Sequence, residues 1–206
     1  MRIGVIVEGK TDWIVFERLV PALCPGSVPT LIHPKQDELE AGKSTGWTEV
    51  RKWFQEKRQH LLLLIQLGGD DLLIVHMDGD VAPDDCKPCR PDAEAQWQAV
   101  STRALSWTGL VRWPERVVLA ICLQQLEAWI CAALDDGQAQ DARLECCAAP
   151  ERQIAEEHWW AVEQRDVATY RETFAPAVLR EWKRVLDCCP VGAGRLDAAL
   201  KEFLER

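Results

Sequence analysis

Short apolar runs alternate with amphipathic stretches along the first two thirds of the chain. Runs rich in β-branched residues predict four buried strands, at residues 2–7, 28–33, 71–77 and 116–122. Apolar positions at helical spacing predict a helix after each strand, at residues 11–20, 47–66, 93–108 and 124–134. This alternation is typical of an α/β domain. We therefore predict a Rossmann-like, mainly parallel four-stranded sheet flanked by helices.

Local signals mark the ends of several elements. The Thr11 side chain can cap the first helix, and Pro21 and the Pro-Gly pair at residues 25–26 are expected to end it. Residues 34–46 and 81–92 lack a hydrophobic period and predict loops.

The pattern changes near residue 135. Residues 135–137, Asp-Asp-Gly, break the alternation, and the remainder keeps helical periodicity without a strong strand. We expect an α/β domain at residues 1–135 and a helical appendage, residues 136–206, packed on the same domain.

Three carboxylates follow predicted strands. Glu8 comes directly after the first strand, and Asp78 and Asp80 come directly after the third. Parallel sheets build sites at the carboxyl ends of their strands, so these side chains converge if the two strands are neighbours. A cluster of like charges requires a cation, and oxygen ligands favour Mg²⁺ or Mn²⁺. Gly9 and Gly79 allow tight turns and a close approach to a ligand. The simpler alternative is a helix cap at Glu8 and an ordinary Asp-Gly turn.

Three more residues are candidates for the same site. Glu127 is the only charged residue between positions 117 and 134, so it needs a metal, a polar partner or an arginine. Lys10 is placed to meet a phosphate oxygen as a point charge, or else it is a solvated loop lysine. Asp12 lies in the first turn of the first helix, where it can support the site.

The two carboxylate motifs together resemble a known family. Residues 7–12, Val-Glu-Gly-Lys-Thr-Asp, and residues 75–80, Val-His-Met-Asp-Gly-Asp, are similar to the motifs of the Toprim domain. That domain occurs in topoisomerases, bacterial primases, ribosomal-RNA maturases and the overcoming-lysogenization-defect nucleases. The resemblance implies that Glu8 is a general acid/base or metal ligand. It also implies that Asp78 and Asp80 hold Mg²⁺, which polarises a phosphate.

The expected function follows from this resemblance. It implies a Mg²⁺- or Mn²⁺-dependent nuclease that hydrolyses DNA or RNA phosphodiesters, with Glu8, Asp78 and Asp80 as catalytic residues. Gly9 and Lys10 would meet the substrate phosphate, and Glu127 would join the metal ligands. Residues 127–129, Glu-Ala-Trp, also resemble small bacterial Toprim-like proteins, some of which are linked to phage defence.

Charge leaves two other functions open. The net charge is −9, whereas a protein that holds DNA by itself usually has a basic surface. One alternative is therefore a silent or partner-dependent effector or adaptor, for example beside a partner ATPase. A homo-oligomer is also compatible with the sequence. The other alternative is a haloacid-dehalogenase-type phosphatase with Asp78 as nucleophile, although this leaves Glu8 without a role.

Cysteine content and hydropathy bear on location. No apolar stretch reaches about 18 residues, so we expect no membrane span. No signal-peptide pattern precedes the first strand, which favours the cytoplasm. The nine cysteines are then expected to be reduced thiols or metal ligands. Cys86 and Cys89 form half of a zinc motif, but no second half of matching spacing follows.

His76 and residues 192–195 are weaker candidates for a site. His76 lies inside the third strand, where a core or second-shell histidine is more common than a ligand. Residues 192–195, Gly-Ala-Gly-Arg, open the last predicted helix, whose backbone N–H groups favour an anion.

Overall fold

The computed structural model of the protein describes most of the chain. The described residues are 1–40, 46–57, 61, 71–79, 92–134, 144–146, 150, 154 and 156–206. Asp80, Cys86 and Cys89, the loop expected at residues 81–91 and most of the second half of the helix expected at 47–66 lie outside these residues.

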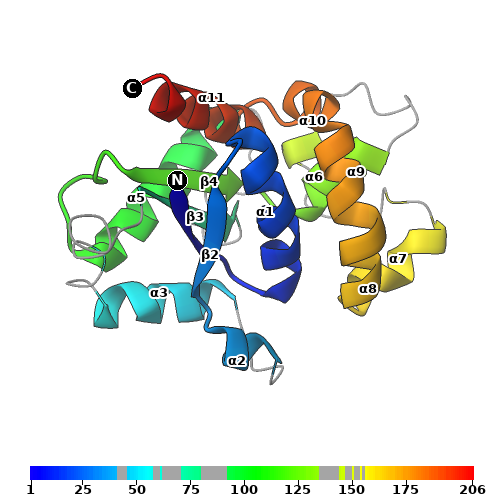
Figure 1. The fold of residues 1–206 in the computed structure, drawn as a ribbon, viewed down its shortest axis with the longest axis horizontal. Coiled ribbons are helices and arrows are strands. Elements are labelled where there is room, and N and C mark those ends of the chain that lie inside the picture. Colours follow the sequence, from blue (N-terminus) through cyan, green and yellow to red (C-terminus); the bar gives the residue numbers. More distant parts are fainter. Residues whose placement is uncertain are drawn as a thin grey trace.

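A four-stranded parallel sheet forms the centre of the molecule (Figure 1). Its strands are β1 (Arg2–Ile6), β2 (Val28–His33), β3 (Leu72–Asp78) and β4 (Val117–Cys122). They lie in the order β2-β1-β3-β4, and every neighbouring pair is parallel. The predicted α/β class and all four strands are confirmed. Because β1 and β3 are neighbours, their carboxyl ends lie side by side.

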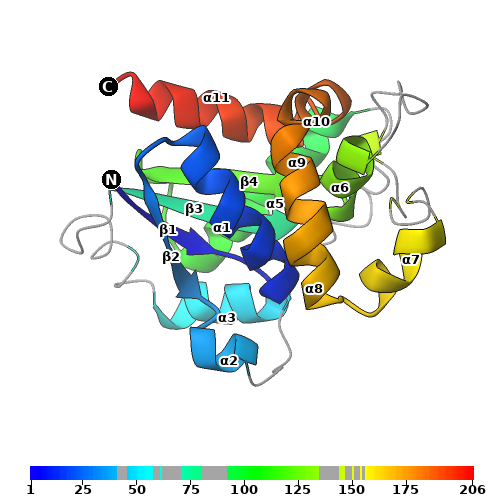
Figure 2. The ribbon, with the colours of Figure 1, turned by 45° about the vertical axis from the view of Figure 1, so that its right-hand side comes forward.

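Helices cover both faces of the sheet (Figure 2). On one face, the core joins the sheet to helices that include α1 (Lys10–Leu23), α6 (Glu127–Leu134), α9 (Ala175–Arg180), α10 (Trp182–Cys188) and α11 (Gly192–Leu204). On the other face, the core joins it to α3 (Trp47–Glu56) and α5 (Ala93–Thr108). Burial on both faces explains why the strands are continuous apolar runs rather than alternating ones.

The direction of each β3 side chain decides which face it serves. Successive side chains of a strand point to opposite faces. Leu72 and Ile74 belong to the core on the α1 side, whereas Leu73 and Val75 belong to the core on the α5 side. His76 and Asp78 share the parity of Leu72, so they point toward the α1 side.

In the part of the C-terminal third that the structure describes, helices are joined by turns and no strand occurs, as predicted. It contains a 3-10 turn (Leu144–Cys146), α7 (Glu156–Glu163), α8 (Val167–Thr169) and a π-helical turn (Tyr170–Phe174), followed by α9, α10 and α11. Phe174, Val178 and Leu196 share one core with Ile14 of α1 and Trp129 of α6. The appendage therefore packs on the α1 side of the sheet.

Local signals were less accurate than the overall pattern. Gly9 is the N-cap of α1, so Thr11 lies inside the helix and the prediction that it caps was wrong. Pro21 also lies inside α1, because a proline in the last turn removes one hydrogen bond without preventing that of Cys24 to Val20.

A short helix, α2 (Gln36–Glu40), occupies part of the predicted loop at 34–46, with two acidic residues in its first turn. Among the described helices, none combines the length and apolarity needed to cross a membrane.

Candidate metal centre

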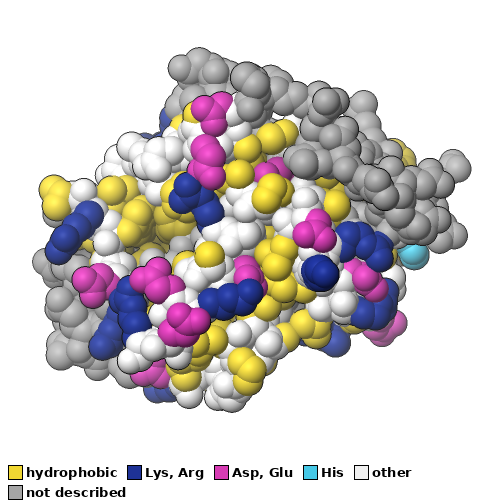
Figure 3. Space-filling view, turned by 90° about the horizontal axis from the view of Figure 1, so that it is seen from above, with side chains coloured by type: hydrophobic (Ala, Val, Ile, Leu, Met, Phe, Trp, Pro, Cys, Tyr) yellow, Lys and Arg dark blue, Asp and Glu magenta, His cyan; other side chains and the backbone are white. Residues whose placement is uncertain are grey.

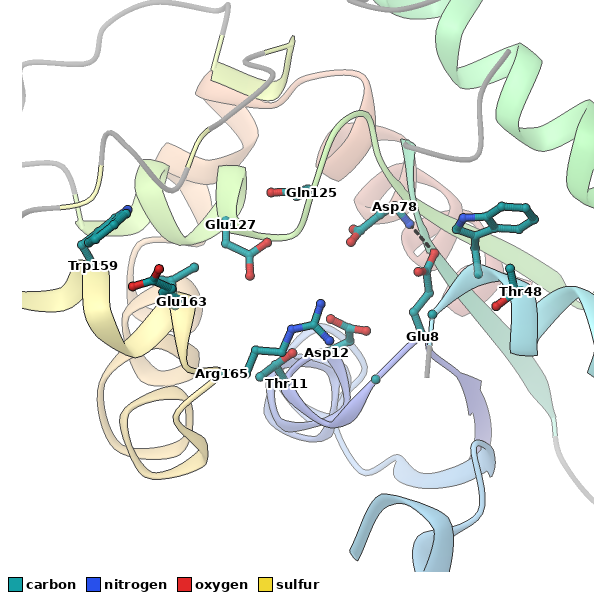
Figure 4. Close-up of a pocket in the computed structure, with 14 residues that line it drawn as sticks. Glu8, Thr11, Asp12, Thr48, Asp78, Gln125, Glu127, Trp159, Glu163 and Arg165 are labelled. Carbon is teal, nitrogen blue, oxygen red and sulfur yellow. Dashed lines mark hydrogen bonds between the residues drawn. The ribbon is translucent and has the colours of Figure 1, made fainter. Parts of the chain in front are cut away.

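Glu8 and Asp78 meet at the carboxyl edge of the sheet. Glu8 follows β1 and its side chain reaches the end of β3, where its Oε1 atom accepts a hydrogen bond of 2.9 Å from the backbone N–H of Asp78 (Figure 4). Glu8 is 8% exposed, and the side chain of Asp78 is 20% exposed. The predicted convergence of these two carboxylates is confirmed. Asp80, the third member, lies outside the described residues.

The pair lines a pocket of about 620 Å³ between the sheet edge and the helical appendage. Five carboxylates line it: Glu8, Asp12, Asp78, Glu127 and Glu163. Arg165 supplies the one cationic side chain among the described lining residues, and Trp159 stands at the far wall (Figure 4). A surplus of carboxylates in one hollow favours a bound cation.

Glycine has a different role at each strand end. Gly9 has extended backbone and lines the pocket at the start of α1. At Gly79, a Cβ atom would collide with the backbone carbonyl of Leu123, and its N–H donates to the Gln124 carbonyl at 2.9 Å. Gly79 therefore lets β3 pack against the loop after β4. The close approach expected there is an approach to the chain itself.

Asp12 and His76 lie side by side beneath the pocket. Asp12 lines the pocket from α1, with Oδ1 3.9 Å from Nε2 of His76. His76 is 0% exposed, and its Nδ1 lies 2.9 Å from the Ala120 carbonyl oxygen. Burial lowers the pKa of His76, opposed by the charge of Asp12 and the bond to Ala120. His76 is therefore a buried histidine that adjoins the site.

Cys122 lies beside His76 and Asp78, and it was not among the site residues predicted from the sequence. It ends β4 and pairs in register with Asp78. Its Sγ, a carboxylate oxygen of Asp78 and a ring nitrogen of His76 all lie within 4.8 Å of one another. Burial raises the pKa of the Cys122 thiol well above its usual range, and nearby carboxylates raise it further. Its place at the end of a predicted strand was the available signal.

Glu127 begins α6 at the pocket wall, where it is half-buried. Its Oε1 accepts a 2.6 Å hydrogen bond from the Tyr170 hydroxyl. Burial raises the pKa of Glu127, while the bond from Tyr170 and the charge of Arg165 act in the opposite direction. Burial and the charge of Glu127 raise the pKa of Tyr170. The polar partner expected for this glutamate is therefore a tyrosine, beside which a metal remains a prediction.

Arg165 adopts a conformation that is unusual for its residue type. It follows α7 with φ of 49°, in the left-handed region. Its N–H donates to Val162, and that of Asp166 donates to Ala161, which is the Schellman pattern at a helix end. Glycine is the common residue at this position because a side chain there is strained. The sequence pattern does not reveal this residue, because α7 is placed over the pocket only by tertiary packing.

The remaining candidates are placed away from the pocket wall. Lys10 begins α1 but is not among the described residues that line the pocket. The N-terminus of α11 holds an anion from the chain itself. Glu145 accepts hydrogen bonds from the N–H groups of Val191 at 3.2 Å and Gly192 at 2.8 Å. Burial raises the pKa of Glu145, and these bonds oppose the rise.

The cysteines divide into two groups. Cys24, Cys122, Cys131, Cys188 and Cys189 are reduced thiols, as expected. Cys146 is disulfide-bonded, so the expectation of reduced thiols is wrong there. The zinc half-motif at Cys86 and Cys89 lies outside the described residues.

In comparisons with known proteins, no protein-family model, curated protein or solved structure matches this chain.

Proposed function

We propose that the protein is a Mg²⁺- or Mn²⁺-dependent nuclease that hydrolyses phosphodiester bonds of DNA or RNA. The observation that carries the proposal is the hydrogen-bonded meeting of Glu8 and Asp78 at the wall of an acidic pocket. The same two residues carry the resemblance to the Toprim domain. Carboxylate oxygens are the ligands that Mg²⁺ and Mn²⁺ prefer, so the residues present fit such an ion.

Each residue has a defined part in this proposal. Glu8 and Asp78 hold the ion, and the N–H of Asp78 fixes the orientation of the Glu8 carboxylate. The bound ion supplies polarisation of the phosphate and activation of water. Glu127 is held in place by Tyr170 and faces the same pocket.

Arg165 and Trp159 fit a nucleic-acid strand. A guanidinium binds phosphate oxygens in a bidentate manner, and Arg165 lines the same pocket as Glu8 and Asp78. Trp159 is an exposed aromatic side chain at the pocket wall. Bases stack on such side chains without regard to sequence. A nucleic-acid strand with unpaired bases would contact both residues, whereas an isolated phosphate would contact Arg165 alone.

A second candidate is a partner-dependent effector, including one that serves anti-phage defence beside an ATPase. Its support is electrostatic. The net charge is −9, and on the face shown in Figure 3 basic side chains are interspersed with acidic ones. A partner that supplies a basic surface would bring nucleic acid to this pocket.

The test is cleavage of plasmid, single-stranded DNA and RNA by the purified chain with Mn²⁺ or Mg²⁺. Wild type is compared with Glu8→Gln and with Glu17→Gln, a matched substitution on the exposed side of α1. We expect Glu8→Gln to abolish cleavage and Glu17→Gln to retain it. A folded, metal-binding wild type that cleaves none of the three would contradict a free-standing nuclease and favour the partner-dependent effector.

The phosphatase alternative is separated in the same series by a phosphate monoester, p-nitrophenyl phosphate. Monoester hydrolysis that requires Asp78 and survives Glu8→Gln would favour the phosphatase. The contact of Glu8 with the Asp78 backbone supports the opposite result.

A further inference from the structure

A second group of metal-ligating side chains lies beneath the pocket floor. His76 and Asp78 are two residues apart on β3, and Cys122 ends the neighbouring strand β4. In register, Asp78 pairs with Cys122 and His76 pairs with Ala120. All three side chains therefore project from the same face of the sheet, toward α1. One ligand atom from each lies within 4.8 Å of the other two.

The orientation of His76 leaves a lone pair pointing into this group. Nδ1 lies 2.9 Å from the Ala120 carbonyl oxygen, which only accepts, so Nδ1 carries the proton. Nε2 of the neutral ring is then an acceptor. It faces Oδ1 of Asp78 at 3.7 Å and Oδ1 of Asp12 at 3.9 Å, which are acceptors as well.

Burial makes this arrangement costly. His76 is fully buried, and its Nε2 has no hydrogen-bond partner among the described residues. A buried acceptor without a partner destabilises a fold, and facing carboxylate oxygens add to the cost. A cation between these atoms removes both costs. The bond from Nδ1–H to a backbone carbonyl is the outer contact that metal-bound histidines commonly make.

We propose that His76 Nε2, Asp78 Oδ1 and Cys122 Sγ bind a first-row transition-metal ion, with Zn²⁺ as the preferred ion. This proposal does not rest on the nuclease function, because such an ion can bind whether or not the pocket cleaves a substrate.

The donor set decides the class of metal. Nitrogen and thiolate sulfur favour Zn²⁺ and related ions over Mg²⁺, which prefers oxygen alone. Tetrahedral Zn²⁺ with these ligands places donor atoms about 3.3–3.7 Å apart, and the distance from Nε2 to Asp78 Oδ1 is 3.7 Å. Asp12, or water, completes the fourth position.

Binding has a defined proton balance. The thiol of Cys122 becomes a thiolate, and its proton is released to the solvent. The surroundings are apolar, since Phe16 packs against the His76 ring with centroids 4.9 Å apart, and Trp129 packs against Phe16. Asp78 also lines the pocket, so in this proposal it contacts both the transition-metal ion and the pocket above that ion.

Co²⁺ is a spectroscopic probe for this site. Metal-free protein is titrated with Co²⁺, and the thiolate-to-cobalt charge-transfer band and the tetrahedral ligand-field bands are recorded. Zn²⁺ is then added as a competitor. We expect the bands to saturate at one Co²⁺ per chain and to disappear with Zn²⁺. Absence of a charge-transfer band in the wild type would overturn the proposal without any variant.

Variants assign the ligands. Cys122→Ser should lose the charge-transfer band and weaken Zn²⁺ binding at least tenfold, whereas Cys24→Ser, at another buried free thiol, should keep both. Glu8→Gln should keep the band even though it loses cleavage, which separates this proposal from the proposed nuclease. An unchanged band in Cys122→Ser, or its loss in Cys24→Ser or Glu8→Gln, would contradict the ligand set.

Discussion

Helices α1 and α11 both begin near a glycine, and their N-termini have different surroundings. At α11, the N–H groups of Val191 and Gly192 bind the buried carboxylate of Glu145. At α1, the N-cap is Gly9, which has no side chain to cap the helix and which lines the acidic pocket. Helix N-termini favour anions.

The N-terminus of α11, which we call the closed end, is thus bound by a carboxylate of the chain, whereas that of α1 lies at the proposed metal site. The chain closes α11 with its own carboxylate, and the anion predicted there from the sequence is internal. The N-terminus of α1 lies beside Glu8 and Asp78 at the pocket wall, and we call it the open end. Glu8 reaches the end of β3, and both carboxylates line the pocket, where a metal and a phosphate would bind together.

The open end should be the more sensitive one for activity. We predict that Asp78→Asn lowers the cleavage rate by about 100-fold or more, because an ion that stabilises developing charge is lost. Metal-free thermal stability should stay equal or rise, since one of several like charges is removed. Cleavage rates and thermal melts with a chelator measure both. A large fall in metal-free stability would count against the carboxylate cluster.

Arg165 tests whether the open end binds a phosphate. In Arg165→Gly, we predict about 10–100-fold weaker substrate binding, the value of a hydrogen bond to a charged group. The left-handed conformation should at the same time become less strained, which adds about 1 kcal/mol to the free energy of unfolding.

Arg165→Ala is the matched control, because it loses the guanidinium but keeps a Cβ atom. It should show the same loss of substrate binding without the gain in stability. Substrate titrations and urea unfolding of both variants provide the measurements, and equal binding by all three proteins would exclude Arg165 from the site.

The closed end should matter for stability alone. Glu145→Ala leaves the N–H groups of Val191 and Gly192 without their carboxylate, and we predict a loss of about 1–3 kcal/mol in the free energy of unfolding. Glu145→Gln retains an acceptor and should lose less. Below their melting temperatures, both variants should cleave at the wild-type rate. A cleavage defect would show that the two helix ends are not functionally separate.

The smallest predicted effect is a pH-dependent change in the free energy of unfolding on substitution of Glu127. Its pKa is raised in the folded protein, mainly by burial. Its contribution to stability is therefore fully present below the unfolded value near 4.5 and is lost as the pH rises through the higher folded value. Glu127→Gln should be more stable than wild type at mildly alkaline pH, with a difference that shrinks toward acidic pH. Urea unfolding with a chelator across this range measures it, and a difference that grows on acidification would contradict the raised pKa.

The sequence predicted the fold of the molecule better than its candidate site. β3 and β4 are apolar on both faces, which marks buried parallel strands in any context. The order of the strands in the sheet depends on tertiary structure. The proximity of Glu8 and Asp78 could therefore be predicted only on the condition that β1 and β3 are neighbours. The proximity of Cys122 to His76 follows from the register of β3 with β4, which the sequence pattern does not indicate.

The sequence predicted less about the helical appendage than about the sheet. Helical periodicity predicted its helices but not which surface they cover. Arg165 and Trp159 reach the pocket only because α7 lies beside the sheet edge, and Glu145 meets α11 from 47 residues away. Long-range contacts of this kind leave no local pattern.

The central claim is that Glu8 and Asp78 form a divalent-cation site in the pocket. Mn²⁺ binding, followed by the electron paramagnetic resonance signal of the free ion, tests it most directly on wild type, Glu8→Gln, Glu17→Gln and Cys122→Ser. The account predicts that Glu17→Gln and Cys122→Ser bind Mn²⁺ in the pocket as wild type does and that Glu8→Gln does not. Unchanged Mn²⁺ affinity and stoichiometry in Glu8→Gln would contradict it.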